Sequence, residues 1–372
     1  MKYYLIAGEA SGDLHGAYLI NALAKIDPDA SFRCWGGDMM AAAGADLQKH
    51  YRDLAFMGFV EVLLNIRTIL GNFKTCKEAI LEYQPDVLIL VDYPGFNLRM
   101  AKWAKQQGIK VFYYISPQIW AWHSSRVHQI KANVDEMFVI LPFEQDFYAK
   151  YGMEVNFVGH PLLDVIRDHH PDPDFRQKNK LSDQPIIALL PGSRKQEISR
   201  MLSVLLATAD NFPGYQFVVA GAPSQDRDYY LSLFAELGRG DSIKLVQGQT
   251  YTLLQNAEAA LVTSGTATLE TALLECPQIV CYRGSSISYA IAKRVINVKY
   301  ISLVNLIMDE ELVVELIQDD FSVERTTQAL HQLLQASEKA RIAKGYQLLK
   351  TKLGEGGAAD RCAKLMVDTL KK

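Results

Sequence analysis

Hydrophobic residues occur in short uninterrupted runs, and polar, glycine-rich turns separate these runs. Apolar runs of this kind, each ending at a turn, predict parallel β-strands buried on both faces, with helices between them. The predicted strands are 3–7, 32–37, 87–91, 111–115, 134–140, 155–158, 186–190, 215–221, 244–246, 259–262 and 279–283. The last part of the chain has a helical pattern that Gly354-Glu355-Gly356-Gly357 interrupts. The pattern predicts an α/β protein.

The unit of strand, glycine turn and helix begins twice in the chain. It occurs at 3–13 and again at 186–194, just after a polar segment, 168–180, that prolines interrupt. A chain of 372 residues also exceeds what one ordinary core holds. We expect two α/β domains with a cleft between them, 1–166 and 167–344, with a C-terminal helical part, about 345–372, that can return to the first domain.

Composition and charge narrow the function classes. The net charge of −3 gives no basic field of the kind that nucleic acid attracts. The five cysteines are scattered and form no C-x-x-C pair, which favours reduced thiols and a cytoplasmic setting over a disulfide frame or a zinc site. Charged residues follow the first apolar run too soon for a signal peptide, and no run reaches the ~20 residues that span a bilayer. Any membrane contact is expected at the surface.

The first glycine turn offers an anion site of uncommon spacing. Its glycines are Gly8, Gly12 and Gly16, which do not form the G-x-G-x-x-G fingerprint of a nicotinamide dehydrogenase. Backbone N–H groups at the start of the helix can still bind an anion. Glu9 and Asp13 either complement the helix dipole, with Ser11 or Asp13 as the cap, or contact a ligand. Both interpretations stay open.

Two later loops of the first domain carry candidate side chains. Asp92 directly follows the apolar strand 87–91, where it either caps the next turn or acts as a general base. Trp120 and Trp122 share the loop after 111–115. Their indole rings suit a sugar face or an acyl chain, and a packed aromatic cluster is the alternative.

The second domain carries features of a phosphate site. Arg194 lies just past the strand 186–190, where a helix begins. Ser264-Gly265-Thr266 opens the helix after 259–262 and is expected to cradle a diphosphate, whereas Thr250 is expected to cap the helix 251–256. Glu270 lies one turn inside its helix and is expected to bind a ribose diol, with a salt bridge as the less favoured alternative.

The segment 56–70 is more apolar than one buried helix face requires. On the residues alone we expect a helix in the core. A surface that rests in a lipid interface or lines an acyl pocket is the alternative.

Six motifs, taken together and in order, resemble the lipid-A-disaccharide synthase family. They are Gly8-Glu9-Ala10-Ser11-Gly12-Asp13, Asp92-x-Pro94-x-Phe96-Asn97, Ser116-Pro117-Gln118-x-Trp120-Ala121-Trp122, Gly159-His160-Pro161-Leu162, Leu190-Pro191-Gly192-Ser193-Arg194 with Glu197, and Ser264 to Glu270. The resemblance covers almost the whole chain. It implies an inverting glycosyltransferase of the GT-B fold, with two Rossmann-like domains facing a cleft. Such an enzyme joins UDP-2,3-diacylglucosamine to 2,3-diacylglucosamine 1-phosphate through a β-1,6 bond and releases UDP.

The resemblance also assigns roles to residues. It implies Asp92 as the base and Asn305 as a second catalytic residue, and it reverses our preference for 56–70, which it places on the membrane or the acyl chains. The implied substrate-binding residues are Glu9, Ser11, Gly12, Trp120, Arg194, Ser264, Gly265, Thr266 and Glu270. Whether Glu9, His15 or His123 assists Asp92 stays open.

The resemblance carries expectations about setting as well. It implies an enzyme without cofactor or metal. It also implies a cytoplasmic location with peripheral attachment to the inner-membrane surface. A homodimer that forms by exchange of C-terminal segments is compatible with the resemblance. The sequence departs from the family where Leu303-Val304-Asn305 and Val313-Val314-Glu315-Leu316 lack the usual prolines. The alternatives in other classes are a UDP-sugar 2-epimerase and a non-catalytic UDP-sugar binding protein. UDP release that depends on an acceptor distinguishes all three.

Overall fold

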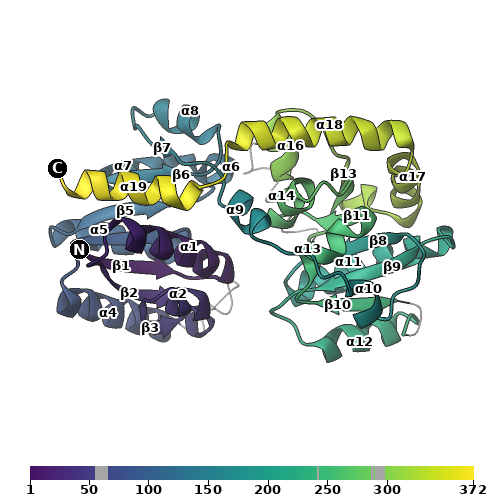
Figure 1. Ribbon diagram of the computed structural model, residues 1–372, viewed down its shortest axis with the longest axis horizontal. Helices are drawn as coiled ribbons and strands as arrows, with labels where there is room; N and C mark the ends of the chain where they lie inside the picture. Colours follow the sequence, from purple (N-terminus) through teal and green to yellow (C-terminus); the bar gives the residue numbers. More distant parts are fainter. Residues whose placement is uncertain (55–65, 241–242, 286–288, 290–297) are drawn as a thin grey trace. The chain divides into compact units, whose positions relative to one another are not determined.

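The chain forms two compact units, each built on its own parallel sheet (Figure 1). The structure is a computed structural model, and it describes every residue except 55–65, 241–242, 286–288 and 290–297. Unit 1 comprises residues 1–161 and 355–372, and unit 2 comprises residues 162–354.

Unit 1 contains a seven-stranded sheet in the order β3-β2-β1-β4-β5-β6-β7, in which every neighbouring pair is parallel. Its strands are β1 (Lys2–Ala7), β2 (Ser31–Gly36), β3 (Asp46–His50), β4 (Val87–Val91), β5 (Lys110–Tyr114), β6 (Glu136–Val139) and β7 (Asn156–Phe157). Its helices are α1 (Ala10–Ile26), α2 (Asp38–Ala42), α4 (Ile66–Tyr83), α5 (Pro94–Gln106), α6 (Ile119–Trp122), α7 (Val127–Asn133), α8 (Glu144–Ala149) and α19 (Ala358–Leu370), with 3₁₀ turns at Tyr51–Leu54 and Ser124–Arg126.

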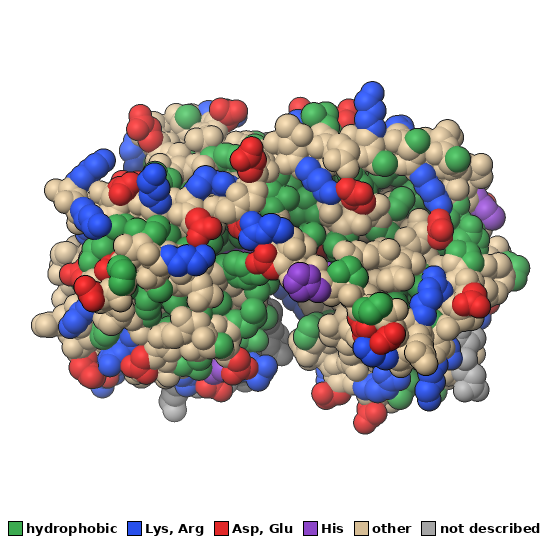
Figure 2. Space-filling model, viewed as in Figure 1, with side chains coloured by type: hydrophobic (Ala, Val, Ile, Leu, Met, Phe, Trp, Pro, Cys, Tyr) green, Lys and Arg blue, Asp and Glu red, His purple; other side chains and the backbone are tan. Residues whose placement is uncertain are grey.

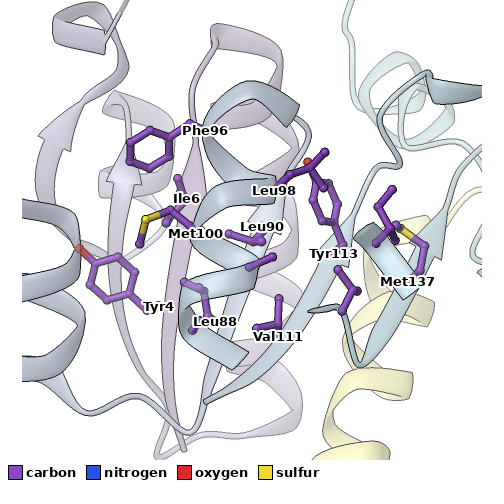
Figure 3. Close-up of a cluster of buried hydrophobic side chains, with 14 of the residues drawn as sticks. Tyr4, Ile6, Leu88, Leu90, Phe96, Leu98, Met100, Val111, Tyr113 and Met137 are labelled. Atoms are coloured by element: carbon purple, nitrogen blue, oxygen red, sulfur yellow. The ribbon is translucent and has the colours of Figure 1, made fainter. Parts of the chain in front are cut away.

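Both faces of this sheet are covered, which explains the uninterrupted apolar runs. Alternate strand residues, such as Tyr4 on β1, Leu90 on β4 and Tyr113 on β5, form one buried cluster with side chains of α4, α5 and α7 (Figure 3). On the other face, α1 contacts β1, β2 and β4 and packs against α19. A strand that is buried on both sides needs no polar alternation.

Unit 2 contains a six-stranded parallel sheet in the order β10-β9-β8-β11-β12-β13. Its strands are β8 (Ile186–Leu190), β9 (Gln216–Gly221), β10 (Lys244–Gln247), β11 (Ala257–Thr263), β12 (Gln278–Tyr282) and β13 (Glu315–Ile317). Its helices are α9 (Leu162–Arg167), α10 (Phe175–Lys178), α11 (Lys195–Thr208), α12 (Arg227–Glu236), α13 (Thr250–Gln255), α14 (Thr266–Leu273), α16 (Leu303–Met308), α17 (Val323–Leu333) and α18 (Ala336–Leu353), with 3₁₀ turns at Ala209–Asn211 and Gln318–Asp320.

Each predicted strand is present, and the sequence missed two edge strands. These are β3, whose side chains are partly or fully exposed, and β13, which falls in a stretch expected to be helical. Neither of these two edge strands carries a continuous apolar run, so the hydrophobic pattern did not reveal them. The expected cap at Thr250 is also wrong, because Gln249 holds the N-cap position and Thr250 is the first helical residue of α13.

The units divide at 161/162 and 354/355, whereas the sequence suggested 166/167 and about 345. Contacts between α9 and α14 place 162–167 in unit 2, and α18 extends that unit to the glycine-rich break. In unit 1, Arg361 of α19 donates hydrogen bonds to the carbonyl oxygens of Val158 (2.9 Å), Gly356 (2.7 Å) and Glu355 (2.7 Å). These bonds hold the start of α19 on unit 1.

Two further properties bear on function. All five cysteines are free and buried. None of the helices in the described part of the chain combines the length and the apolar character that spanning a bilayer requires. On the face seen in Figure 2, Lys and Arg side chains are interspersed with Asp and Glu side chains on each unit, in keeping with the small net charge.

Candidate active site

Each unit has one topological switch point, and most of the predicted residues follow the strands that meet there. The order of strands reverses between β1 and β4 in unit 1, where Ala7 pairs with Val91, and between β8 and β11 in unit 2, where Leu190 pairs with Val262. Ligands of open α/β sheets bind beyond the carboxyl ends of the strands at such points. In unit 1, Glu9 lies in the turn after β1 and Asp92 directly follows β4, Ser11 and Gly12 lie in the first turn of α1, and Trp120 lies in the short helix α6 after β5. In unit 2 the turn after β8 carries Arg194, the turn after β11 carries Ser264 and Gly265, and the helix α14 that follows carries Thr266 and Glu270.

The turn after β1 presents Glu9 and Ser11 to solvent and buries Gly12. A Cβ at Gly12 would lie 3.1 Å from the Cβ of Ala7, so this glycine lets α1 pack closely on β1. Glu9 is the N-cap residue of α1. The exposed pair, Glu9 and Ser11, is therefore the part of this turn that a ligand can reach.

Asp13 has a structural partner that the sequence did not indicate. Its carboxylate accepts hydrogen bonds from the backbone N–H groups of Gly37 (2.8 Å), Met39 (3.1 Å) and Met40 (3.0 Å). It thus satisfies the open N-terminus of α2. The expectation that Ser11 or Asp13 caps α1 is wrong, because Glu9 occupies the N-cap position of α1 and Asp13 caps α2.

Asp92 occupies the first position beyond β4 in an unusual backbone conformation. Its φ is +44°, and that of the next residue, Tyr93, is +52°. Left-handed conformations are costly for residues other than glycine, and they gather at functional sites. Burial, and then the negative charge of Glu9, raise the pKa of the Asp92 carboxyl to about 6, against a hydrogen bond from the Tyr93 backbone that lowers it. A carboxylate with this pKa suits a general base near neutral pH.

This pKa predicts the acid side of the pH profile. The kcat/KM should be flat above pH about 6 and fall tenfold per pH unit below it, because protonated Asp92 cannot accept a proton. Replacing Glu9 by Gln removes a negative charge that raises the pKa of Asp92. The acid limb of the profile, where kcat/KM falls, should therefore lie at lower pH in the Glu9→Gln variant than in the wild type. Initial rates over a pH series measure this shift.

Asp38→Asn is the matched control for this experiment. Asp38 is also an exposed carboxylate at a helix start in unit 1, and it is not among the groups that shift the pKa of Asp92. Its acid limb should match the wild type. An unmoved limb in Glu9→Gln would instead assign the titration to another group, such as Glu144, whose pKa burial raises to about 7.

Glu144 lies between the turn after β6 and the loop that carries Trp120. Its buried carboxylate accepts hydrogen bonds from the N–H groups of Ile140 (3.2 Å) and Leu141 (2.9 Å). The side chains of Trp120 and Ser116 act with these backbone bonds to oppose the effect of burial on its pKa. The Trp120 ring packs edge-on against Phe143, with ring centroids 4.9 Å apart. Trp120 is thus partly buried in an aromatic contact and keeps some accessible surface.

The two histidines considered as helpers of Asp92 differ in setting. His15 is buried on α1, and burial lowers its pKa to about 4, so it is a neutral imidazole at neutral pH. His123 is half-buried, and its ring lies 4.4 Å from that of Trp122. At neutral pH, His15 therefore adds no charge to the site.

In unit 2, Arg194 is the N-cap residue of α11. Its side chain is 66% exposed, and its guanidinium pairs with Glu197 at 3.4 Å. A guanidinium has five N–H donors, so this single long contact leaves donors for a phosphate. Gly192 has a φ of +103°, and a Cβ there would lie 2.9 Å from Oε2 of Glu197. Glycine at this position lets Glu197 approach the turn and hold Arg194.

The turn after β11 opens α14 with Gly265 at the N-cap. Its φ of +156° and ψ of −164° lie in a region that essentially only glycine adopts. The Ser264 hydroxyl donates to the carbonyl of Ile301 (2.9 Å), and Thr266 is exposed. The first turn of a helix has N–H groups without intrahelical partners, so this end of α14 suits an anion.

Glu270 lies within α14 and accepts a hydrogen bond from the Tyr251 hydroxyl at 2.7 Å. Burial raises the pKa of its carboxyl. The partner that the structure gives it is a neutral hydroxyl rather than a cation. One carboxylate oxygen engaged by Tyr251 leaves acceptor capacity for a diol.

Asn305 on α16 is fully buried, and its amide is occupied by the protein. Its Nδ2 donates to the Val313 carbonyl (2.8 Å) and to Glu315 Oε1 (2.9 Å), and its Oδ1 accepts from the Val313 N–H (3.0 Å). Glu315 also accepts from the N–H of Ile301 (2.9 Å), whose carbonyl binds Ser264. The geometry favours a role in positioning the Ser264 turn over direct contact with a substrate.

The prediction for 56–70 falls largely outside the described residues, which resume at Ile66, the start of α4. Leu70, the last residue of that stretch, is 60% exposed. Across the described ranges, no group of three or more His, Cys, Asp or Glu side chains is arranged to hold a metal ion.

Comparison with solved structures shows which fold the two units form. The chain is similar to UDP-GlcNAc 2-epimerase from Neisseria meningitidis, with a TM-score of 0.65, 13% identity and 100% of each chain covered. It is also similar to the glycosyltransferase of kitacinnamycin, with a TM-score of 0.68, 14% identity and 99% of each chain covered. At this identity the likeness shows the fold, which is the GT-B-like pair of Rossmann-like units that glycosyltransferases and these epimerases share.

The sequence comparisons assign the particular family. A family profile described as Lipid-A-disaccharide synthetase matches residues 3–366. The chain is 42% identical to lipid-A-disaccharide synthase of Syntrophus aciditrophicus, covering 99% of this chain and 97% of that protein. It is 41% identical to the same enzyme of Myxococcus xanthus, covering 99% and 97%. The chain belongs to the lipid-A-disaccharide synthase family, which confirms the prediction of a glycosyltransferase of lipid A biosynthesis.

Proposed function

We propose that the enzyme transfers the sugar of UDP-2,3-diacylglucosamine to the 6-hydroxyl of 2,3-diacylglucosamine 1-phosphate and releases UDP. Family membership supports these lipid A precursors as substrates. The observation that carries the mechanism is Asp92, a carboxylate with a raised pKa that stands beyond β4 at the switch point of unit 1. Unit 1 is proposed to bind the acceptor and unit 2 the UDP-sugar donor.

The proposed reaction is a single displacement. The acceptor oxygen forms a bond to the anomeric carbon on the face opposite UDP, while the bond from that carbon to the diphosphate oxygen breaks. Asp92 takes the proton of the attacking hydroxyl, and the configuration inverts to give the β-1,6 bond. The electron pair of the broken bond leaves with UDP.

The residues of unit 2 are proposed to stabilise the leaving group. The Arg194 guanidinium and the N–H groups at the start of α14 place positive charge where the diphosphate gains negative charge. Glu270 is proposed to bind the ribose diol with the carboxylate capacity that Tyr251 leaves. In unit 1, Glu9, Ser11, Gly12 and Trp120 form the proposed acceptor surface.

UDP release tests the proposed reaction directly. The purified protein is given the diacylated UDP-glucosamine with and without the diacylated sugar 1-phosphate, and UDP is measured over time. We expect UDP only when both lipids are present. UDP that appears without the acceptor would contradict the transfer reaction.

The fold supports a second candidate, a UDP-sugar 2-epimerase. The N. meningitidis epimerase, whose structure holds UDP-GlcNAc, shares the architecture over its whole length. An epimerase needs no lipid acceptor, so the same assay distinguishes the two functions. Conversion of the donor sugar at C2 without acceptor would favour the epimerase.

We also propose that the enzyme acts in the cytoplasm on the inner-membrane surface. The exposed side chain of Leu70 at the end of the apolar stretch supports this proposal, and a bound lipid substrate requires access to a bilayer. Sedimentation with vesicles of anionic phospholipid tests it. A homodimer that exchanges C-terminal segments is a further proposal, and light scattering of the purified protein tests it.

A further inference from the structure

The backbone at Asp92 and Tyr93 stays in two consecutive left-handed conformations, with φ of +44° and +52°. Residues other than glycine disfavour this region of φ and ψ, so such a conformation persists only where surrounding contacts impose it. Three of the contacts that hold this backbone come from side chains of α5 and β5 and from the turn after β1.

The first contact comes from Asn97 on α5. Its amide Nδ2 lies 2.7 Å from the carbonyl oxygen of Asp92, and 3.3 Å and 3.4 Å from those of Val91 and Ile6. Asn97 is fully buried, so these bonds are shielded from water. One amide thus joins the ends of β1 and β4, the two strands of the switch point.

The second contact comes from Tyr113 on β5. Its hydroxyl donates to the same Asp92 carbonyl at 2.6 Å, and its ring lies in the buried cluster of Figure 3. The two lone pairs of that carbonyl oxygen are therefore both engaged. The peptide after Asp92 cannot rotate without losing both bonds.

The third contact is between Tyr93 and Gly8. A Cβ built on Gly8 would lie 2.3 Å from two atoms of the Tyr93 ring, so the ring rests directly on the glycine of the turn after β1. On its other side the ring stacks on Phe96, with centroids 5.9 Å apart. The residue after Asp92 is thereby fixed as well.

We propose that Asn97 and Tyr113 are positioning residues for catalysis, which hold the strained Asp92 backbone so that its carboxylate points toward the acceptor hydroxyl. This inference rests on the proposed role of Asp92 as the base. Without the two bonds, the peptide after Asp92 relaxes to a commoner conformation and the carboxylate turns toward water. A reacting group misplaced by about 1 Å can cost roughly a hundredfold in rate.

Tyr113→Phe is the test, because it removes one hydroxyl and leaves the ring in the core. We expect kcat to fall roughly ten- to hundredfold with KM and the Kd of UDP unchanged. We also expect the acid limb of the pH profile to move to lower pH, because a carboxylate that turns toward water loses the burial that raises its pKa. A merely structural role for the hydroxyl would leave the limb in place.

Tyr4→Phe is the matched control. Tyr4 is a fully buried tyrosine of β1 in the same cluster, and its hydroxyl has no hydrogen-bond partner in the described structure (Figure 3). We expect kcat and the pH profile of Tyr4→Phe to match the wild type. Asn97→Ala should repeat the effect of Tyr113→Phe on kcat and the limb. If Asn97→Ala does not fold, Tyr113→Phe alone decides.

The outcomes separate this inference from the proposed function. If Asp92→Asn is slow but Tyr113→Phe behaves as Tyr4→Phe does, Asp92 remains the base and the positioning role is overturned. If Asp92→Asn keeps the wild-type kcat, the base itself is misassigned and the positioning role fails with it. A slow Tyr113→Phe with a shifted acid limb supports both.

Discussion

Asp92→Asn should lower kcat by about 10²–10⁴-fold, the usual contribution of a positioned general base. The amide has the shape of the carboxyl but cannot take the proton of the attacking hydroxyl. Asn also tolerates the left-handed φ of this position better than most residues do, so the backbone should stay in place. Single-turnover rates with both lipids, and calorimetry with UDP, measure the loss of rate and the retained affinity.

Asp309→Asn is the control for the same chemical change. Asp309 is exposed at the end of α16, and its φ of +58° lies in the same region as that of Asp92. Its variant should keep the wild-type kcat. If Asp92→Asn lost UDP affinity as much as kcat, Asp92 would be a structural residue, and the base would have to be sought elsewhere in unit 1.

The central strands of both sheets could be predicted from the sequence because their burial is two-sided. A run such as Val87–Val91 has no polar position, since α-helices cover both faces of β4. The edge strand β13 has only one buried residue of its three, Leu316. Its pairing with β12 is a tertiary contact that leaves no pattern in the local sequence.

Some residues of the candidate site could likewise be found from the sequence, whereas others could not. The positions of Asp92 and Arg194 at sheet ends could be predicted, because Asp92 directly follows an apolar strand, Arg194 lies just past another, and parallel strands expose their carboxyl ends at one edge. Tyr113 could not be predicted, because a tyrosine inside an apolar strand is identical in pattern to a core residue. Its hydroxyl gains its role only when α5 and β4 bring the Asp92 carbonyl to it.

Asn305 shows how a resemblance can locate a residue without giving its role. The resemblance selected Asn305, and the structure surrounds its amide with Val313 and Glu315 of the same unit. Glu315 stands in the motif that lacks the family's usual proline, and it links α16 to the loop that binds Ser264. In this chain, which lacks that proline, the hydrogen bonds of Asn305 and Glu315 therefore fix the loop that binds Ser264.

Gly265→Ala should raise the Kd of UDP roughly 5- to 150-fold. Its φ of +156° and ψ of −164° are open essentially to glycine alone, and holding another residue there costs about 1–3 kcal/mol. A Cβ at Gly265 meets no atom within 4 Å, so crowding does not contribute. In the Gly265→Ala variant, the N-cap peptide relaxes to a less strained conformation that points its N–H group away from the ligand. Only the small population of molecules that keeps the native turn then binds the diphosphate. Calorimetric titration with UDP measures the change.

Gly248→Ala separates this effect from the general cost of alanine at positive φ. Gly248 precedes α13, has a φ of +70° and also has open space around its Cβ position, so its variant should bind UDP as the wild type does. The pH profile of Gly265→Ala should keep its acid limb, because the groups that shift the pKa of Asp92 do not include the start of α14. If the Gly265→Ala variant bound UDP as tightly as the wild type does, the start of α14 would not be part of the donor site. Arg194 would then be the proposed ligand of the diphosphate. Loss of affinity with an unmoved acid limb would instead show that the leaving-group site and the base act as separate parts of the reaction.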